Sequence, residues 1–396
     1  MISCLIKDCY FTFYIKSALK IPNFALIHPI TYLIMQNKQS GFDIDLGNQC
    51  SQNAFSWAKK TFANRAGKAG QVVLKVDGAF SNMLDFNGVK IGITSDGIGT
   101  KIEVAERTGI YDTLGYDLVA MVADDLIAGG FVPTNISNII DVDNLDYNII
   151  DQLMRGLHHA ANFAGIAVTG GEIAELGSRI SGWGNNMHFN WCSTAIGVLH
   201  PRLQHPVDGS AVHEGDAVIA LRSRGFRSNG FSAVRKIMQE QFGNQWHTQP
   251  YSDGQSWGEI LLTPSLIFAP AVTNVINEGI GIKGIAHITG GGIADNFRRV
   301  LKVNRMGANL HNLFEPHPFM VQLANYGHVT PQQAYLYWNM GNGMLLITAN
   351  KDAEKTVELL NTAGEYQAQV AGHITAKRRI TIETVWGSII TALENE

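Results

Sequence analysis

The stretch "TLGYDLVAMVADDLIAGG" (113–130) is the most informative in the chain. Its apolar residues recur at helical spacing, so we predict an amphipathic helix that ends at the glycine pair. Aspartates interrupt the pattern. On a wheel of about 100° per residue, Asp125 falls in the middle of the apolar stripe, while Asp117 and Asp124 lie together on its edge. A carboxylate inside such a stripe is costly unless it is paired, hydrogen-bonded or bound to a cation.

The stretch "TSDGIGTK" (94–101) lies just upstream and favours the functional interpretation of Asp125. The preceding "VKIGI" (89–93) alternates apolar and polar residues, which predicts a half-buried strand that runs into a glycine-rich turn. Asp96 and Lys101 give this turn both signs of charge. A structural Asp125, bonded to backbone amides or placed on a surface, stays open as the alternative. We favour a cation or phosphate site.

Glycine clusters recur three more times. "VTGGEIAE" (168–175) places Glu172 after two glycines, and "RSNGFSAVRKIM" (227–238) and "AHITGGGIADNFRRVL" (286–301) each lead from a strand into a helix. The first amides of a helix can hold a phosphate. Each cluster alone is weak, and none fits the P-loop or the dinucleotide-binding pattern. Together, four such turns predict a nucleotide site of a different kind, with magnesium held by the acids and the phosphates.

Composition excludes several other classes. The chain has 396 residues, of which 45% are hydrophobic and 16% charged, with a net charge of -4. This length predicts two domains, and there is ample material for their cores. No cluster of Lys and Arg interleaved with aromatics points to nucleic acid. The four cysteines form no CxxC pair, which favours a reducing, cytoplasmic setting.

The ends and the middle of the chain suggest the domain boundaries. Residues 1–34 are apolar but interrupted by charges and prolines, so they fit neither a spanning helix nor a signal peptide. We expect residues 1–40 to be a leader outside the domains, with Met35 as a candidate true start; a membrane-associated leader is the alternative. The Pro- and Gly-rich segment 200–216 predicts an interdomain connection. We therefore expect one domain over 41–205 and a second over 212–390, both of mixed α/β or α+β type.

Seven motifs carry a resemblance to a known family. In order along the chain they are "GFDIDLGN", "SDGIGTK", "DTLGYDLVAMVADDL", "TGGEIAE", "RSNGFSAVRK", "IAHITGGG" and "WNMGNGM". This order and spacing resembles the phosphoribosylformylglycinamidine cyclo-ligase family, also called aminoimidazole ribonucleotide synthetase. The resemblance covers about residues 41–375. The related selenophosphate synthetase and thiamin-monophosphate kinase families fit the "SNG" and "HITGGG" blocks less well.

The resemblance implies an α+β fold, a reaction and a homodimer. The N-terminal sheet would join the partner's sheet in a barrel, and the C-terminal domain would be an α/β sandwich. ATP would phosphorylate the formyl amide oxygen of formylglycinamidine ribonucleotide, and the amidine nitrogen would then close the imidazole ring. ATP and Mg²⁺ are therefore implied, with a small-molecule substrate, a cytoplasmic location, and neither nucleic acid nor membrane as a partner.

Site residues follow from the same resemblance. It implies catalytic roles for Asp96, Lys101, Asp125 and His287, and a magnesium site made by Asp96, Asp125 and Glu172. It implies ATP binding by Asp96, Gly97, Gly99, Thr100, Lys101, Gly170, Gly171 and Glu172. It implies substrate binding by Arg227, Ser228, Asn229, Gly290, Gly291 and Gly292.

The chain departs from the family pattern at several positions. The family usually has Asn at the position of Asp124, His at that of Arg227, and Lys at that of Phe55. These changes concern the parts of the site that the resemblance assigns to the nucleotide and to the substrate. A diverged paralogue that phosphorylates another acceptor, and a nucleotide-binding protein without catalysis, therefore stay open as alternatives.

Overall fold

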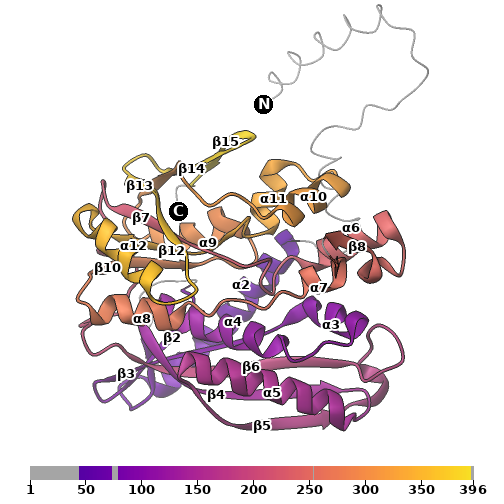
Figure 1. The fold of residues 1–396 in the computed structure, drawn as a ribbon. Coiled ribbons are helices and arrows are strands. Elements are labelled where there is room, and N and C mark those ends of the chain that lie inside the picture. Colours follow the sequence, from indigo (N-terminus) through magenta and orange to yellow (C-terminus); the bar gives the residue numbers. More distant parts are fainter. Residues whose placement is uncertain (1–43, 74–78, 253, 394–396) are drawn as a thin grey trace, which may run out of the picture. The chain divides into compact units, whose positions relative to one another are not determined.

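The structure, a computed structural model, describes residues 44–73, 79–252 and 254–393 (Figure 1). Residues 56–396 form one compact unit that holds all the described strands. The other unit, residues 1–55, contains the beginning of helix α2 (Ile44–Thr61). The predicted leader and its candidate start at Met35 lie outside the described residues.

The N-terminal half forms a six-stranded sheet in the order β1-β2-β3-β6-β4-β5. Neighbouring strands are antiparallel except β4 and β5, which are parallel. The strand predicted at 89–93 is confirmed as the beginning of β3. The glycine-rich turn expected from residue 94 begins later, because β3 continues through Asp96 to Gly97. The strands are β1 (Gln71–Val73), β2 (Asn82–Phe86), β3 (Val89–Gly97), β4 (Phe131–Val142), β5 (Ala167–Glu175) and β6 (Phe189–Leu199).

Helix α4 (Leu114–Ala128) confirms the helix predicted from the opening stretch. It packs on β3, β4 and β6 and also contacts β10 (Ile282–His287) and helices α5 (Tyr147–Ala164) and α8 (Ala269–Asn277). Figure 1 shows it between the strands of the first sheet and the elements of the C-terminal half. Because it is enclosed in this way, 13 of its 15 residues are buried. The expected one-sided stripe is therefore an apolar surface on nearly all sides.

The expected glycine turn at 168–175 is wrong. These residues form β5, which runs parallel to β4 with a register shift between Ile136 and Ser137. Gly170 has a φ of 127°, and a Cβ on Gly171 would lie 2.0 Å from the carbonyl oxygen of Asn138. The two glycines thus allow a close strand pairing with a bulge, since no side chain fits there.

The C-terminal half forms a seven-stranded sheet in the order β10-β12-β7-β13-β11-β14-β15. The segment 200–216 contains neither helix nor strand and links β6 to β7. The predicted strand 217–222 is confirmed as β7, which lies between β12 and β13. The strands are β7 (Ala217–Arg222), β10 (Ile282–His287), β11 (Gly307–Leu310), β12 (Asn342–Thr348), β13 (Ala368–Thr375), β14 (Arg379–Thr384) and β15 (Gly387–Ala392).

Helices α9 and α12 pack on this second sheet, and two helices of this half follow predicted glycine loops. The two helices expected after "RSNG" and "HITGGG" are confirmed as α6 and α9. The fold is thus mixed α/β, as expected, with two large sheets and a two-stranded sheet of β8 and β9. The remaining helices and short strands are α3 (Ile102–Thr108), α6 (Phe231–Phe242), α7 (Trp257–Leu261), α9 (Gly292–Leu301), α10 (Pro318–Tyr326), α11 (Pro331–Tyr337), α12 (Ala353–Thr362), β8 (Pro250–Ser252) and β9 (Gln255–Ser256). Within the described part of the chain, no helix has the length and apolar character needed to cross a bilayer.

Glycines allow α4 and α5 to approach closely, which generates a stability prediction. A Cβ on Gly156 would lie 2.0 Å from the carbonyl oxygen of Asp112, just before α4. We expect Gly156→Ala to lower the free energy of unfolding by about 1–3 kcal/mol, because the backbones would have to separate. Gly281→Ala is the matched control, since a Cβ there meets no atom within 4 Å. Urea-induced unfolding measures both; equal stability of the two variants would contradict this close contact.

Candidate active site

The first group of polar residues lies between β3 and α4. Thr94 and Asp96 pair with Ala195 and Ser193 of β6, which are both buried, so their side chains point to the covered face of the sheet. Asp125 of α4 faces them, and the Thr94 hydroxyl donates to Asp125 Oδ2 over 3.4 Å. The structure thus brings together two of the predicted acids, Asp96 and Asp125.

These two acids lie in an environment that disfavours their charged forms. Burial raises the pKa of Asp96 to about 6, and the charge of Asp125 adds to the effect. Burial also raises the pKa of Asp125 to about 7, although Arg299 and the Thr94 hydrogen bond oppose the shift. No Lys or Arg of the described residues forms an ion pair with either carboxylate. A divalent cation between them would supply the missing positive charge, so the two side chains fit magnesium.

Glu172 lies elsewhere. It pairs with Ile139 of β4, whose side chain is 49% exposed on the open face of the sheet. Asp96 and Asp125 lie on the opposite, covered face. Across the described ranges, no three His, Cys, Asp or Glu side chains gather in a way that could hold a metal. The structure therefore does not bring Glu172 to the other two acids within one chain.

A chain of buried polar groups leads from Asp125 into the interior. His287 Nδ1 lies 2.8 Å from Asp125 Oδ1, and its Nε2 lies 2.9 Å from Arg227 Nη2. The same Nη2 donates to Asp124 Oδ2 over 2.7 Å. Burial, reinforced by the charge of Arg227, lowers the pKa of His287 to about 3, so the ring is neutral. Arg227 is 1% exposed and faces inward, although we expected it to face a substrate phosphate.

Lys101 belongs to a second buried ion pair. Its Nζ lies 2.7 Å from Asp117 Oδ2 and donates to the carbonyl oxygen of Thr263 over 2.7 Å. Asp117 Oδ1 accepts from the amide and the hydroxyl of Ser265. Burial lowers the pKa of Lys101 and raises that of Asp117, while their mutual attraction opposes both shifts. Lys101 thus holds α4 to the segment around residue 264, and its amine is fully buried.

Three of the predicted loops, around Thr100, Asn229 and Gly290, lie next to the helices that follow them. Thr100 and Ser232 have their hydroxyls 3.4 Å apart, Asn229 Nδ2 donates to Met121 Sδ, and a Cβ on Gly290 would lie 3.6 Å from Asn229 Oδ1. Helices α6 and α9 begin after Gly230 and Gly291, both left-handed, and neither N-terminus has a side-chain cap. The Gly292 amide at the start of α9 donates to the carbonyl oxygen of Thr289 over 3.1 Å, so it is the other amides in the first turn of each helix that could meet an anion.

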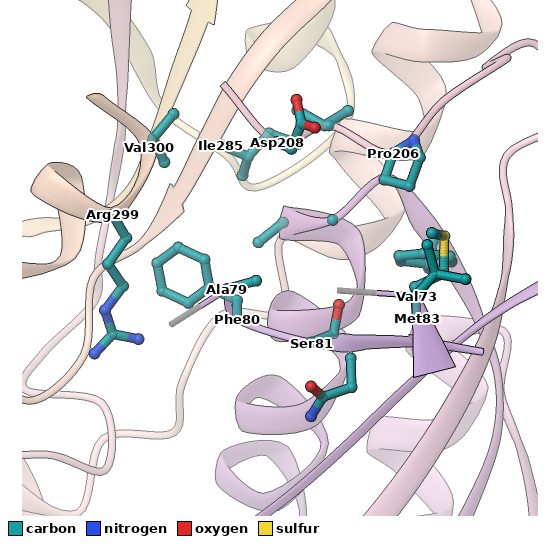
Figure 2. A pocket seen from close by; sticks show the side chains of 15 residues that line it. Val73, Ala79, Phe80, Ser81, Met83, Pro206, Asp208, Ile285, Arg299 and Val300 are labelled. Atoms are coloured by element: carbon teal, nitrogen blue, oxygen red, sulfur yellow. The ribbon is translucent and has the colours of Figure 1, made fainter. Parts of the chain in front are cut away.

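A largely apolar pocket is lined in part by Phe80 and Arg299 (Figure 2). The carbonyl oxygen of Phe80 lies 3.4 Å from the Thr94 hydroxyl, which also contacts Asp125. Phe80 and Arg299 lie side by side on its wall, with the guanidinium 5.0 Å from the ring centre. Phe80 also lies 6.4 Å from the His287 ring, which links the pocket to the buried network. Sequence reasoning missed Phe80, Arg299 and the role of Thr94. Period-two alternation along β3 could have placed Thr94 beside Asp96; no local pattern marked the other two. The lining residues are Val73, Ala79, Phe80, Ser81, Asn82, Met83, Ala128, Gly129, Phe131, Pro206, Val207, Asp208, Ile285, Arg299 and Val300.

Comparison with known proteins first defines the class. Residues 67–198 match the family model described as "AIR synthase related protein, N-terminal domain", and residues 213–385 match the corresponding C-terminal domain. A solved structure described as "AaThiL complexed with AMPPCP and TMP" has a TM-score of 0.56 at 14% identity, covering 83% of this chain and 92% of that one. The fold is thus that of the AIR synthase-related proteins.

Two curated relatives then define the family. The phosphoribosylformylglycinamidine cyclo-ligase of Thermococcus kodakarensis is 32% identical over 345 residues, covering 87% of this chain and 97% of the relative. That of Carboxydothermus hydrogenoformans is 33% identical over 353 residues, covering 87% and 98%. The chain belongs to the phosphoribosylformylglycinamidine cyclo-ligase family. The resemblance in the seven motifs is confirmed, and with it the expectation of a ligase of purine biosynthesis.

The buried Lys101–Asp117 pair generates a prediction about the structural role of Lys101. Lys101→Met leaves the Asp117 charge buried without its partner, so we expect the free energy of unfolding to fall by about 3–5 kcal/mol. The double variant Lys101→Met/Asp117→Asn removes both charges and keeps an oxygen for Ser265, so it should regain much of that loss. Urea-induced unfolding measures both variants. A Lys101→Met protein as stable as the wild type would contradict the structural role.

Proposed function

We propose that the chain catalyses the ATP-dependent ring closure of formylglycinamidine ribonucleotide to aminoimidazole ribonucleotide, with release of ADP and phosphate. Family membership over nearly the full length of the curated relatives carries this proposal. The AMPPCP named in the solved structure, an ATP analogue, supports a nucleotide site on this fold. The enzyme would act in the cytoplasm in purine biosynthesis.

On this proposal Asp96 and Asp125 hold a magnesium ion, which would neutralise charge on the ATP phosphates. Gly97 ends β3 directly after Asp96, and Gly99 and Thr100 belong to the short 3-10 turn Gly99–Lys101 that follows. A Cβ on Gly99 meets no atom within 4 Å, so a phosphate has room to approach the backbone there. Because the Lys101 amine is buried against Asp117 and the carbonyl oxygen of Thr263, we propose that Lys101 supports this segment and does not bind a phosphate.

The substrate phosphate is proposed to lie where the glycine loops meet. The uncapped N-termini of α6 and α9 supply amides, and Asn229 and Gly290 to Gly292 shape the loops. The Ser228 hydroxyl is buried and has no hydrogen-bond partner among the described residues, which suits a polar ligand atom. Holding the ribonucleotide at this end would keep its chain folded for nitrogen attack at the phosphorylated amide carbon.

The open face of the first sheet is proposed as the homodimer interface. Ile139, Ile196 and Val198 are 49%, 37% and 41% exposed on it. Packing this apolar face against a second copy would close the two sheets into the expected barrel. Gly170, Gly171 and Glu172 lie on an edge strand of the same sheet. We propose that they reach a nucleotide only through that interface.

Substrate-dependent ADP release tests the function. The purified chain with ATP, Mg²⁺ and formylglycinamidine ribonucleotide should release one ADP for each aminoimidazole ribonucleotide formed. ADP release that requires a different acceptor would instead identify a diverged paralogue. Nucleotide binding without turnover would identify a non-catalytic protein. No observation in the structure favours either of these two.

Asp125 is the residue on which the cation proposal depends most. We expect Asp125→Leu to abolish turnover while the protein stays folded, because the apolar side chain suits the helix but cannot bind magnesium. Asp125→Asn keeps the shape and should lower turnover while raising the magnesium concentration needed for half-maximal rate. Melting temperature and ADP release measure both properties. A folded, fully active Asp125→Leu enzyme would show that Asp125 binds no essential cation.

A further inference from the structure

Arg227 occupies an unusual position that its predicted role does not explain. Its backbone is left-handed, with φ of 61°, a conformation that non-glycine residues adopt only when their surroundings enforce it. Its side chain is 1% exposed. Its Nη1 donates to the carbonyl oxygen of Leu266 over 3.0 Å, and its Nη2 reaches both Asp124 and His287. The guanidinium is thus directed into the protein.

Asp124 anchors this guanidinium. Its Oδ2 accepts from Arg227, and its Oδ1 accepts from the backbone amides of Phe268 and Ala269 at 2.8 and 2.9 Å. These amides belong to the beginning of α8, where an anion is favoured. Both carboxylate oxygens are therefore engaged, and Arg227 is held from one side by a group that cannot turn without losing several hydrogen bonds.

His287 is held from the other side, and its tautomer follows from the geometry. A guanidinium has donors and no acceptor, so the contact at 2.9 Å requires His287 Nε2 to accept. The proton of the neutral ring must then lie on Nδ1, which donates to Asp125 Oδ1 over 2.8 Å. That bond leaves Oδ2 of Asp125 turned toward Thr94, on the side of Asp96.

We propose that Arg227 is a positioning residue that fixes the Nδ1–H tautomer of His287 and thereby aims Asp125 at the cation site. Without a donor at Nε2, either ring nitrogen can carry the proton. When Asp125 is ionised, as it must be to bind a cation, the Nε2–H tautomer places the Nδ1 lone pair against the carboxylate, and the repulsion turns the carboxylate away. The tautomer assignment stands by itself, whereas its effect on cation binding rests on the proposed function.

Nitrogen-15 NMR of the histidine side chains tests the tautomer. The chain contains 13 histidines, so a His287→Gln variant is needed to assign the His287 signals. The wild type should show one His287 species, protonated on Nδ1. The double variant Asp124→Asn/Arg227→Met removes the donor and both charges but keeps an oxygen for the α8 amides. It should show a mixture of tautomers.

Two further variants make the comparison specific. Lys101→Met/Asp117→Asn removes the other buried ion pair of α4, which does not contact His287, and should leave the His287 tautomer unchanged. Arg227→Lys restores a cationic donor and should keep the Nδ1–H form.

Mn²⁺ binding, followed by water-proton relaxation without nucleotide or substrate, should weaken by about 10–100-fold in Asp124→Asn/Arg227→Met. In Arg227→Lys the Mn²⁺ affinity should change by less than about 10-fold.

The outcomes separate this inference from the proposed function. A pure Nδ1–H species in Asp124→Asn/Arg227→Met would show that Asp125 alone sets the tautomer, and would overturn the inference. Mixed tautomers with unchanged Mn²⁺ affinity would overturn the positioning role. Mixed tautomers in both double variants would indicate general disruption and would also overturn it. A wild type without substrate-dependent ADP release, but with the expected tautomers and Mn²⁺ affinities, would contradict only the proposed function.

Discussion

The structure depends on the burial of two carboxylates of one helix, Asp117 and Asp124, seven positions apart on α4. Buried charges persist only when each is paired and its remaining oxygens accept hydrogen bonds. Both conditions hold: Lys101 and Ser265 satisfy Asp117, while Arg227 and the first amides of α8 satisfy Asp124. Ser265 and the first amides of α8 belong to the segment 263–269. Helix α4 is therefore bound to that segment at two points, which fixes the position of the loops around it.

Most of the fold could be predicted from the sequence because local periodicity marks it. The helix at 113–130, the strands at 89–93 and 217–222 and the helices after two glycine loops all follow from spacing and composition. The turn expected around Gly170 and Gly171 could not be placed correctly, because a strand with a bulge and a glycine turn have the same local composition. Only the pairing of this segment with β4 distinguishes the two structures, and the paired residues lie more than 30 positions apart in the sequence.

The acids of the candidate site were predicted only in part. The resemblance implied that Asp96, Asp125 and Glu172 lie together; the structure brings Asp96 and Asp125 to the covered side of the first sheet and leaves Glu172 on its open side. The helical wheel did not predict that Asp117 and Asp124 are buried. A wheel assumes one buried face, whereas α4 is enclosed on nearly all sides. The ion pair of Asp124 with Arg227 joins residues 103 positions apart, so no local pattern could reveal it. The two positions looked like separate departures from the family, yet they satisfy each other inside the protein and give no ground for a different acceptor.

Asp124 and Asp125 are neighbours on one helix, but their side chains face different surroundings. Successive residues of a helix point about 100° apart, so the first faces the buried guanidinium and the second faces β3. His287 bridges them, because its two ring nitrogens contact Arg227 on one side and Asp125 on the other. The ion pair that holds the halves of the chain together therefore also limits how the Asp125 carboxylate can turn. If Asp125 binds a cation as we propose, a carboxylate that is already oriented would lose less freedom when the ion binds.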